Sequence, residues 1–220
     1  MSLRAKHIPI LKDLLTNLSD KSEIDDTLVI VTSDHGEAFG EYSRVDPQVQ
    51  LVGHSWGIHE CLLHIPLVIK LPGQDAGCTI RQAASLTHIP DLIRSVVNRE
   101  EKPEMALTNK DVVASTYRLL EERAAKNFGS ISGVERFVGP WRAVYKNNEN
   151  SVRKFAQKGD YYLTLDIHSP QKAEVISHDN HDYVGGKFNN SENNGLVTKK
   201  STDIDEGLED HLKDLGYIRP

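Results

Sequence analysis

The sequence lacks the features that mark several large classes of protein. Its 220 residues include only two cysteines, Cys61 and Cys78, which are too few for a disulfide framework and do not form a Cys-x-x-Cys zinc pair. No apolar run approaches the roughly 20 residues of a membrane span. The opening residues also lack the basic and then apolar layout of a secretory signal. On this chain alone a cytoplasmic protein is expected, but a signal peptide could lie upstream, so the localisation stays open.

Positive charge is scarce as well. Lys and Arg total 26 against 32 Asp and Glu, giving a formal net charge of −6, and the longest basic run is the Lys199-Lys200 pair. A protein that binds nucleic acid through its phosphates needs a basic patch, so nucleic acid is not an expected partner. The hydrophobic share of 38% is nevertheless enough for a packed core. The chain is therefore expected to be globular.

The first hundred residues follow the pattern of an α/β domain. Apolar residues at helical spacing predict helices at 8–18, 58–63 and 86–97. Short continuous apolar runs at 27–31 and 66–71 are typical of strands buried on both faces of a parallel sheet. The alternation of helices and strands indicates the α/β class.

The character of the sequence changes after the polar stretch 98–104, which is the best candidate for a domain boundary. Short alternating runs beyond it predict a small α+β region at 105–184 with a short antiparallel sheet. Its expected elements are strands at 111–115, 141–146, 161–167 and 173–176 and a helix at 117–128. Residues 185–206, rich in Gly, Asn, Ser and charge, predict a flexible loop, and 207–220 predict a terminal helix.

The sharpest chemical motif stands where the first predicted strand ends. Residues 32–37 read Thr-Ser-Asp-His-Gly-Glu, and ligands of open α/β sheets bind just outside the carboxyl ends of strands. Asp34 and His35 are therefore expected at the active edge, where a carboxylate oxygen and an imidazole nitrogen supply half of a divalent-metal site. An Asp-His-Gly triplet by itself more often caps a turn, so the interpretation depends on its context.

That context resembles the sulfatase branch of the alkaline phosphatase superfamily. Residues 53–73 read GHSWGIHECLLHIPLVIKLPG, similar to the family's Gly-His or Gly-Lys, its Tyr-Glu-Glu-like helix start and its Val-Pro-Leu-Ile-Ile strand ending near Pro-Gly. The resemblance covers residues 26–97 well, and 161–176 and 211–218 more loosely. It implies a partial alkaline-phosphatase-like α/β sandwich, represented by its second half at residues 1–100.

The resemblance also implies roles for individual residues. Asp34 and His35 take the place of two ligands of a divalent ion, which is calcium in most sulfatases and manganese or zinc in phosphatase relatives. His54 stands where the family keeps a cationic group near the transferred sulfate or phosphate, so it would stabilise charge or protonate the leaving group. In a site with two metals it would be a ligand of the second ion. His59 occupies a position where the family commonly has Tyr, so packing is its expected role.

The family's nucleophile is not found in this sequence. Sulfatases use a formylglycine made from the first residue of Cys/Ser-x-Pro-x-Arg, and neither Cys61 nor Cys78 stands in such a motif. The formylglycine is therefore expected upstream, and the chain is interpreted as the C-terminal part of a metal-dependent sulfuric ester hydrolase, inactive in isolation. The alternatives are a phosphodiesterase, phosphomonoesterase or phosphotransferase of the same superfamily, or a non-catalytic truncated remnant.

The expected partners follow from this interpretation. The substrate would be a sulfate ester, either a small molecule or a glycan. Half of a parallel sheet exposes an apolar edge, so the chain is expected to bind the N-terminal half of the enzyme or to associate with itself through that edge.

Overall fold

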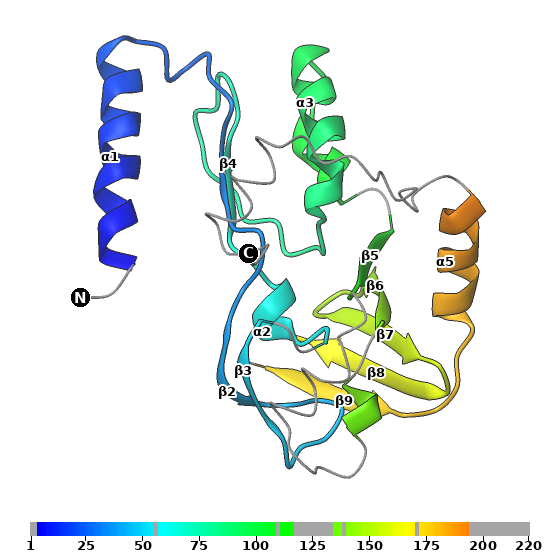
Figure 1. Cartoon of the computed structure of the whole chain (residues 1–220). Helices are drawn as coiled ribbons and strands as arrows, with labels where there is room; N and C mark the ends of the chain where they lie inside the picture. The colour runs from blue at the N-terminus through cyan, green and yellow to red at the C-terminus, as the bar shows by residue number, and fades with distance from the viewer. Residues whose placement is uncertain are drawn as a thin grey trace, which may run out of the picture. The chain divides into compact units, whose positions relative to one another are not determined.

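A computed structural model of the chain describes residues 4–54, 57–108, 111–116, 134–137, 140–169 and 172–193. Residues 1–184 form one compact unit and residues 185–220 a second. Helices and strands are mixed along the chain (Figure 1), which confirms the predicted α/β class. Among the described helices, none has both the length and the apolar character needed to cross a membrane.

The first part of the chain contains all five elements predicted there, with shifted bounds, and an additional hairpin. The elements are α1 (Arg4–Asp20), β1 (Val29–Thr32), β2 (Ala38–Tyr42), β3 (Gln50–Gly53), α2 (Glu60–Leu63), β4 (Leu67–Lys70), the 3-10 turn η1 (Leu86–His88), α3 (Ile89–Val97) and the 3-10 turn η2 (Pro103–Leu107). The hairpin is formed by β2 and β3, which pair antiparallel.

The expectation of a parallel sheet is wrong for the strands that the structure describes. β1 pairs with β4 in antiparallel register, with Val29 opposite Lys70 and Thr32 opposite Leu67. A parallel pair needs a crossover that returns the chain to the opposite end of the sheet. Here Thr32 Oγ1 donates to the carbonyl of Pro66 at 2.9 Å, so the chain leaves β1 and enters β4 at the same end. The apolar runs identified the strands correctly but carried no information about their direction.

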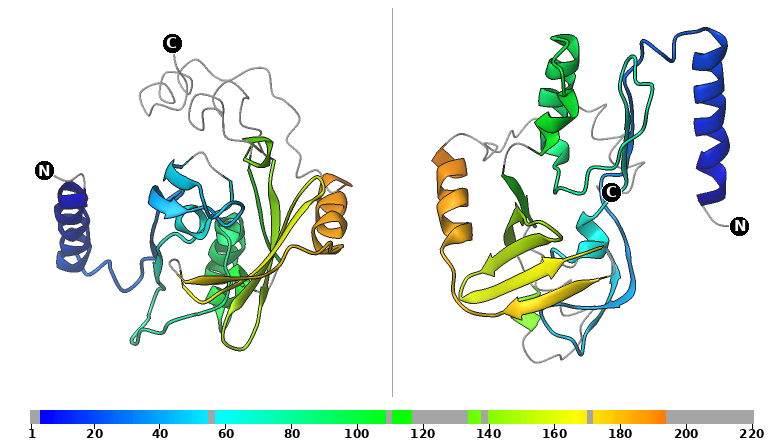
Figure 2. Two further views of the ribbon diagram at one scale, coloured as in Figure 1. Left: turned by 90° about the horizontal axis from the view of Figure 1, so that it is seen from below. Right: turned by 180° about the vertical axis from the view of Figure 1, so that it is seen from behind.

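The later part contains the predicted antiparallel sheet, which has five strands in the order β5-β6-β7-β8-β9 (Figure 2). The strands are β5 (Val112–Ser115), β6 (Arg142–Asn147), β7 (Val152–Lys158), β8 (Tyr161–Ile167) and β9 (Ala173–Ser177). Four of them match predicted strands, while β7 was not predicted because Arg153, Lys154, Gln157 and Lys158 make its sequence polar.

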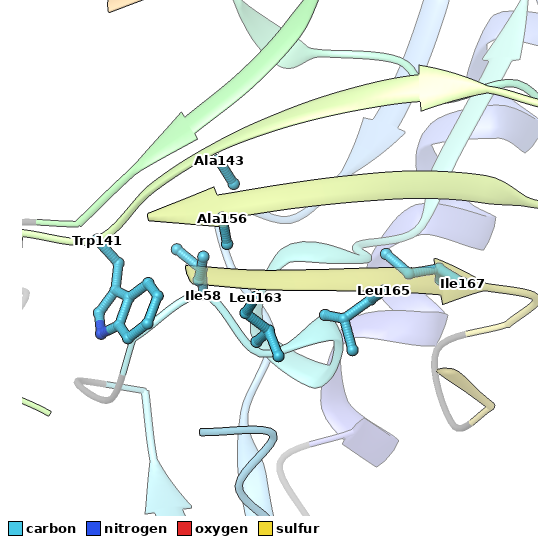
Figure 3. Close-up of a cluster of buried hydrophobic side chains, with 7 residues drawn as sticks. All are labelled: Ile58, Trp141, Ala143, Ala156, Leu163, Leu165 and Ile167. Carbon is cyan, nitrogen blue, oxygen red and sulfur yellow. The ribbon is translucent and has the colours of Figure 1, made fainter. Parts of the chain in front are cut away.

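One hydrophobic core joins the two sides of the predicted boundary at 98–104. Its buried members are Ile58, Trp141, Ala143, Ala156, Leu163, Leu165 and Ile167 (Figure 3). Ile58 comes from the segment just before α2, whereas the others belong to the sheet region. A second core is formed by Ala38, Val49, Leu51, Leu62 and Phe137. The β2-β3 hairpin and α2 therefore share their apolar contacts with residues beyond position 130.

The predicted loop at 185–206 differs from the structure at its start, where α5 (Tyr183–Asn193) is helical. The first turn of α5 is anchored by packing, because Val184 is buried and the ring of Tyr183 stacks on that of Phe155 at 4.3 Å. Burial of Val184 and the stacking contact of Tyr183 favour helix in a sequence that otherwise resembles a loop. The predicted helix at 117–128, the rest of that loop and the terminal helix at 207–220 lie outside the described residues.

Candidate metal centre

Backbone hydrogen bonds fix the chain that leaves β1. The N–H of Gly36 donates to the carbonyl of Leu62 in α2 at 2.8 Å, and the N–H of His35 donates to Asp34 Oδ1 at 2.9 Å. A β-carbon added at Gly36 would lie 2.0 Å from the carbonyl oxygen of Cys61. Position 36 therefore requires glycine for steric reasons, and its two neighbours are held at a fixed place against α2.

Three side chains converge at this point. One ligand atom each from His35, Glu37 and His54 can be chosen so that all lie within 4.8 Å of one another. The two imidazole rings stack at 4.4 Å between centroids, and His54 Nδ1 lies 3.0 Å from Glu37 Oε2. We call these three residues the His-Glu-His cluster.

The β2-β3 hairpin explains why Glu37 and His54 meet. Ala38 at the start of β2 is paired with Gly53 at the end of β3, so the residues just outside this pair stand opposite each other. His35 and Glu37 are two positions apart, a spacing that places side chains on the same side of an extended chain. The cluster is thus assembled by strand register.

The hydrogen bonds leave a lone pair available on His35. Its Nδ1 lies 2.8 Å from the carbonyl oxygen of Gly36, and a carbonyl can only accept, so Nδ1 donates this bond and the lone pair of the neutral ring is on Nε2. Metal-binding histidines usually have this arrangement, with the other ring nitrogen donating to a carbonyl or carboxylate. The side chains of the cluster are 37% (His35), 38% (Glu37) and 52% (His54) exposed. An ion and a substrate can therefore reach them.

The structure brings together two of the three residues that the sequence singled out, His35 and His54, and adds Glu37. Asp34 is 67% exposed, and its Oδ2 lies 3.7 Å from His35 Nε2, but it is not one of the three clustered groups. Glu37 was quoted in the motif without a role. Its spacing from His35 was the available signal, whereas its contact with His54 depends on a hairpin that the sequence analysis did not predict.

The donor set fits a divalent transition metal. Two imidazole nitrogens and one carboxylate oxygen are typical ligands of zinc and of related ions, and catalytic sites keep a further position open for water or substrate. Calcium instead prefers six to eight oxygen ligands. The two imidazoles of the cluster therefore suit zinc better than calcium, the ion expected first from the sequence.

Two neighbouring residues of α2 have structural roles. His59 is buried, accepts a hydrogen bond from the N–H of Cys61 through Nδ1 at 3.1 Å, and lies 3.2 Å from the carbonyl of Tyr42 through Nε2. Burial lowers the pKa of His59, which keeps the ring neutral and suits both bonds. Burial, with Glu41 and Glu60 nearby, raises the pKa of Cys61 to about 11. Cys61 is therefore a protonated thiol, unsuited to be a nucleophile or ligand.

Comparison with known families adds one finding. The family model described as Sulfatase matches residues 10–99. No curated protein and no solved structure gives a match. The matched range contains the whole His-Glu-His cluster and α2, and it ends before the first strand of the five-stranded sheet.

Proposed function

We propose that this chain belongs to a metal-dependent hydrolase of sulfate esters, because residues 10–99 match the family model described as Sulfatase. The observation that carries the proposal is the convergence of His35, Glu37 and His54 inside the matched segment. Fold and family alone would not suffice, because function resides in particular sites. The His-Glu-His cluster is such a site, because it lies where a strand ends and its three groups would leave a coordination position open for water or substrate.

Each cluster residue has a proposed task. His35 binds the cation through Nε2, since Nδ1 donates to the carbonyl of Gly36. Glu37 and His54 complete the set, and Asp34 is close enough to His35 Nε2 to become a further ligand after rotation of its side chain. A bound divalent ion would supply Lewis-acid stabilisation of the negative charge that develops on the ester. If His54 is not a ligand, it acts as the cationic group beside the transferred sulfate.

A second candidate function is hydrolysis of phosphate esters. The specific observation in its favour is the donor set, because two imidazoles suit the manganese or zinc of phosphatase relatives better than calcium. A direct comparison of 4-nitrophenyl sulfate with 4-nitrophenyl phosphate as substrates, made with the chain together with the proposed N-terminal half of the enzyme, separates the two candidates. Preference for the sulfate ester is expected from the family match, and preference for the phosphate ester would favour the second candidate.

The nucleophile is proposed to come from another segment, as a formylglycine. Neither cysteine stands in a Cys/Ser-x-Pro-x-Arg motif, and the Cys61 thiol stays protonated. The proposed partner is therefore the N-terminal half of the enzyme, which would pair with the two-stranded β1-β4 sheet; association of the chain with itself there is the alternative. On this proposal the isolated chain does not turn over substrate. Metal-dependent hydrolysis of an aryl sulfate by the isolated chain, abolished in Asp34→Ala, would refute this placement of the nucleophile.

Metal binding can be measured without turnover. Titration of the 220-residue chain with Zn²⁺, Mn²⁺ and Ca²⁺ should show the tightest binding for Zn²⁺, and loss of one ligand in His35→Gln, Glu37→Gln or His54→Gln should weaken Zn²⁺ binding by at least about 10- to 100-fold. His64→Gln is the matched control, because His64 is an exposed histidine at the end of α2 and outside the cluster. Equal affinities for His54→Gln and His64→Gln would exclude His54 as a ligand.

A further inference from the structure

A buried ion pair connects the five-stranded sheet to the segment that holds the cluster. Lys154 Nζ, on β7, donates to Glu60 Oε1 at 2.8 Å and also to the carbonyl of Ile58. The side chains of Lys154 and Glu60 are only 1% and 2% exposed. Arg44 Nε lies 3.3 Å from the other carboxylate oxygen of Glu60. The carboxylate at the start of α2 is thus held from two sides.

Both partners of this pair are charged. Burial on its own would lower the pKa of Lys154 and raise that of Glu60. Tyr145 and Glu60 together outweigh this effect at Lys154, and Lys154 outweighs it at Glu60, so the pKa of Lys154 is raised and that of Glu60 lowered. A buried ion pair often stabilises a protein no more than apolar side chains of similar volume would. The pair instead fixes the position of α2 relative to β7, because Lys154 Nζ must stay within hydrogen-bond distance of the Glu60 carboxylate.

The geometry imposed on α2 reaches the cluster through contacts of α2 and its N-cap with Gly36 and the end of β2. α2 has four residues, too few to hold its place without tertiary contacts. The carbonyl of Leu62 accepts from the N–H of Gly36, and the ring of His59 contacts the carbonyl of Tyr42 at the end of β2. A displacement of α2 therefore displaces Gly36, whose neighbours are the proposed ligands His35 and Glu37.

We propose that Lys154 is a positioning residue for the His-Glu-His cluster: by holding Ile58 and Glu60 it sets the place of α2, and through Gly36 the place of His35 and Glu37. The five-stranded sheet, which lies outside the family match, thereby determines the geometry of a site inside it. This inference rests on the proposed function, since it requires the cluster to bind a cation.

The test uses Co²⁺, whose visible absorption reports both affinity and ligand geometry, and the whole 220-residue chain. Lys154→Met should weaken Co²⁺ binding by about tenfold or more and alter the absorption spectrum at a temperature where circular dichroism shows a folded protein. The matched control is Arg153→Met, which removes the Arg153–Asp166 ion pair of the same sheet, with Nη2 to Oδ2 at 2.6 Å. Arg153 is the neighbour of Lys154 in the strand, so its side chain points to the opposite face, and Co²⁺ binding should stay within twofold of the unmodified chain.

A double variant separates positioning from stability. Lys154→Met combined with Glu60→Met replaces the pair by apolar side chains, which commonly preserve or raise stability, but the bond to the Ile58 carbonyl is lost. If Lys154→Met fails to fold, the double variant provides the test instead. It too should bind Co²⁺ about tenfold more weakly than the unmodified chain. Affinity and spectrum like those of the unmodified chain in the folded double variant would overturn the inference, as would an equal loss in Arg153→Met. Failure of the unmodified chain to bind Co²⁺ or Zn²⁺ would overturn the proposed function, and the positioning role with it.

Discussion

Replacement of Gly36 by alanine should break the contact that fixes the candidate metal centre to α2. The added β-carbon would lie 2.0 Å from the carbonyl oxygen of Cys61, 3.0 Å from its carbonyl carbon and 3.3 Å from the Cα of Leu62. These are backbone atoms, so no side-chain rotation can relieve the overlap. The loop and α2 must separate by roughly 1 Å or more to reach ordinary contact distances.

The expected cost has two parts. Overpacking of this kind costs about 1–3 kcal/mol, and stretching the bond from the Gly36 N–H to the Leu62 carbonyl adds about 1 kcal/mol. The free energy of unfolding should therefore fall by about 2–4 kcal/mol, a large share of the 5–15 kcal/mol that is typical of domains. With a urea dependence of about 2 kcal/mol per M, the midpoint of unfolding should fall by about 1–2 M.

Urea titration followed by circular dichroism and tryptophan fluorescence measures this change. Gly77→Ala is the matched control, because a β-carbon at Gly77 meets nothing within 4 Å, and alanine at a compatible position is neutral or stabilising by up to about 1 kcal/mol. The Gly36→Ala variant should also lose Zn²⁺ affinity, since the neighbours of Gly36 are the proposed ligands His35 and Glu37. A midpoint within about 0.3 M of the unmodified chain, equivalent to about 0.6 kcal/mol at this urea dependence, would show that the close approach to Cys61 is incorrect.

Two further predictions concern titratable groups beside the cluster. Cys61, with a pKa of about 11, should be about one part in a thousand thiolate at pH 8 and react far more slowly with iodoacetamide than the exposed Cys78. Mass spectrometry after tryptic digestion measures both rates, and comparable rates would contradict the raised pKa of the partly buried Cys61. The pKa of His59 is lower in the folded chain than its usual value of 6.5. The contribution of the neutral ring to the free energy of unfolding should therefore be fully present above pH 6.5 and decrease as the pH falls below it. Thermal unfolding at pH 7.5 and 5.5 should show this decrease and a smaller one in His59→Asn, which keeps a residue suited to the N-cap; an equal decrease in both proteins would exclude His59 as its source.

The sequence predicted those elements whose apolar residues are contiguous or strongly periodic. β8 has the predicted bounds, Tyr161–Ile167, and α3 lies within the helix predicted at 86–97. The β2-β3 hairpin escaped prediction because its outward-facing residues Phe39 and Val52 are themselves apolar and exposed. Without alternation between apolar and polar residues, a short strand has no clear signature. The direction of β4 was mispredicted because pairing depends on contacts between segments, not on composition.

In the candidate site, too, the local motifs could be predicted from the sequence and the contacts between distant segments could not. The motif at 32–37 and the glycine-histidine pair at 53–54 were recognisable because their residue types and order are specific, and they supplied His35 and His54. Glu37 gains its role from strand register, since the Ala38–Gly53 pair sets it opposite His54. Glycine is required at position 36 because α2 approaches it closely. Register and close approach are both tertiary properties, and neither leaves a mark in the local sequence.

The buried pair of Lys154 and Glu60 lies furthest from what a sequence can reveal, because its partners stand 94 positions apart. A polar strand such as β7 looks exposed until the partner of its lysine is known. Once formed, the pair restricts how α2 and the sheet can pack, since any arrangement that separates the two charges without water leaves an uncompensated buried ion at a cost of about 3–5 kcal/mol. Apolar contacts between Ile58 and Trp141 tolerate sliding, but the ion pair does not. The segment matched by the family model and the five-stranded sheet must therefore pack in one arrangement, and the geometry of the cluster depends on both.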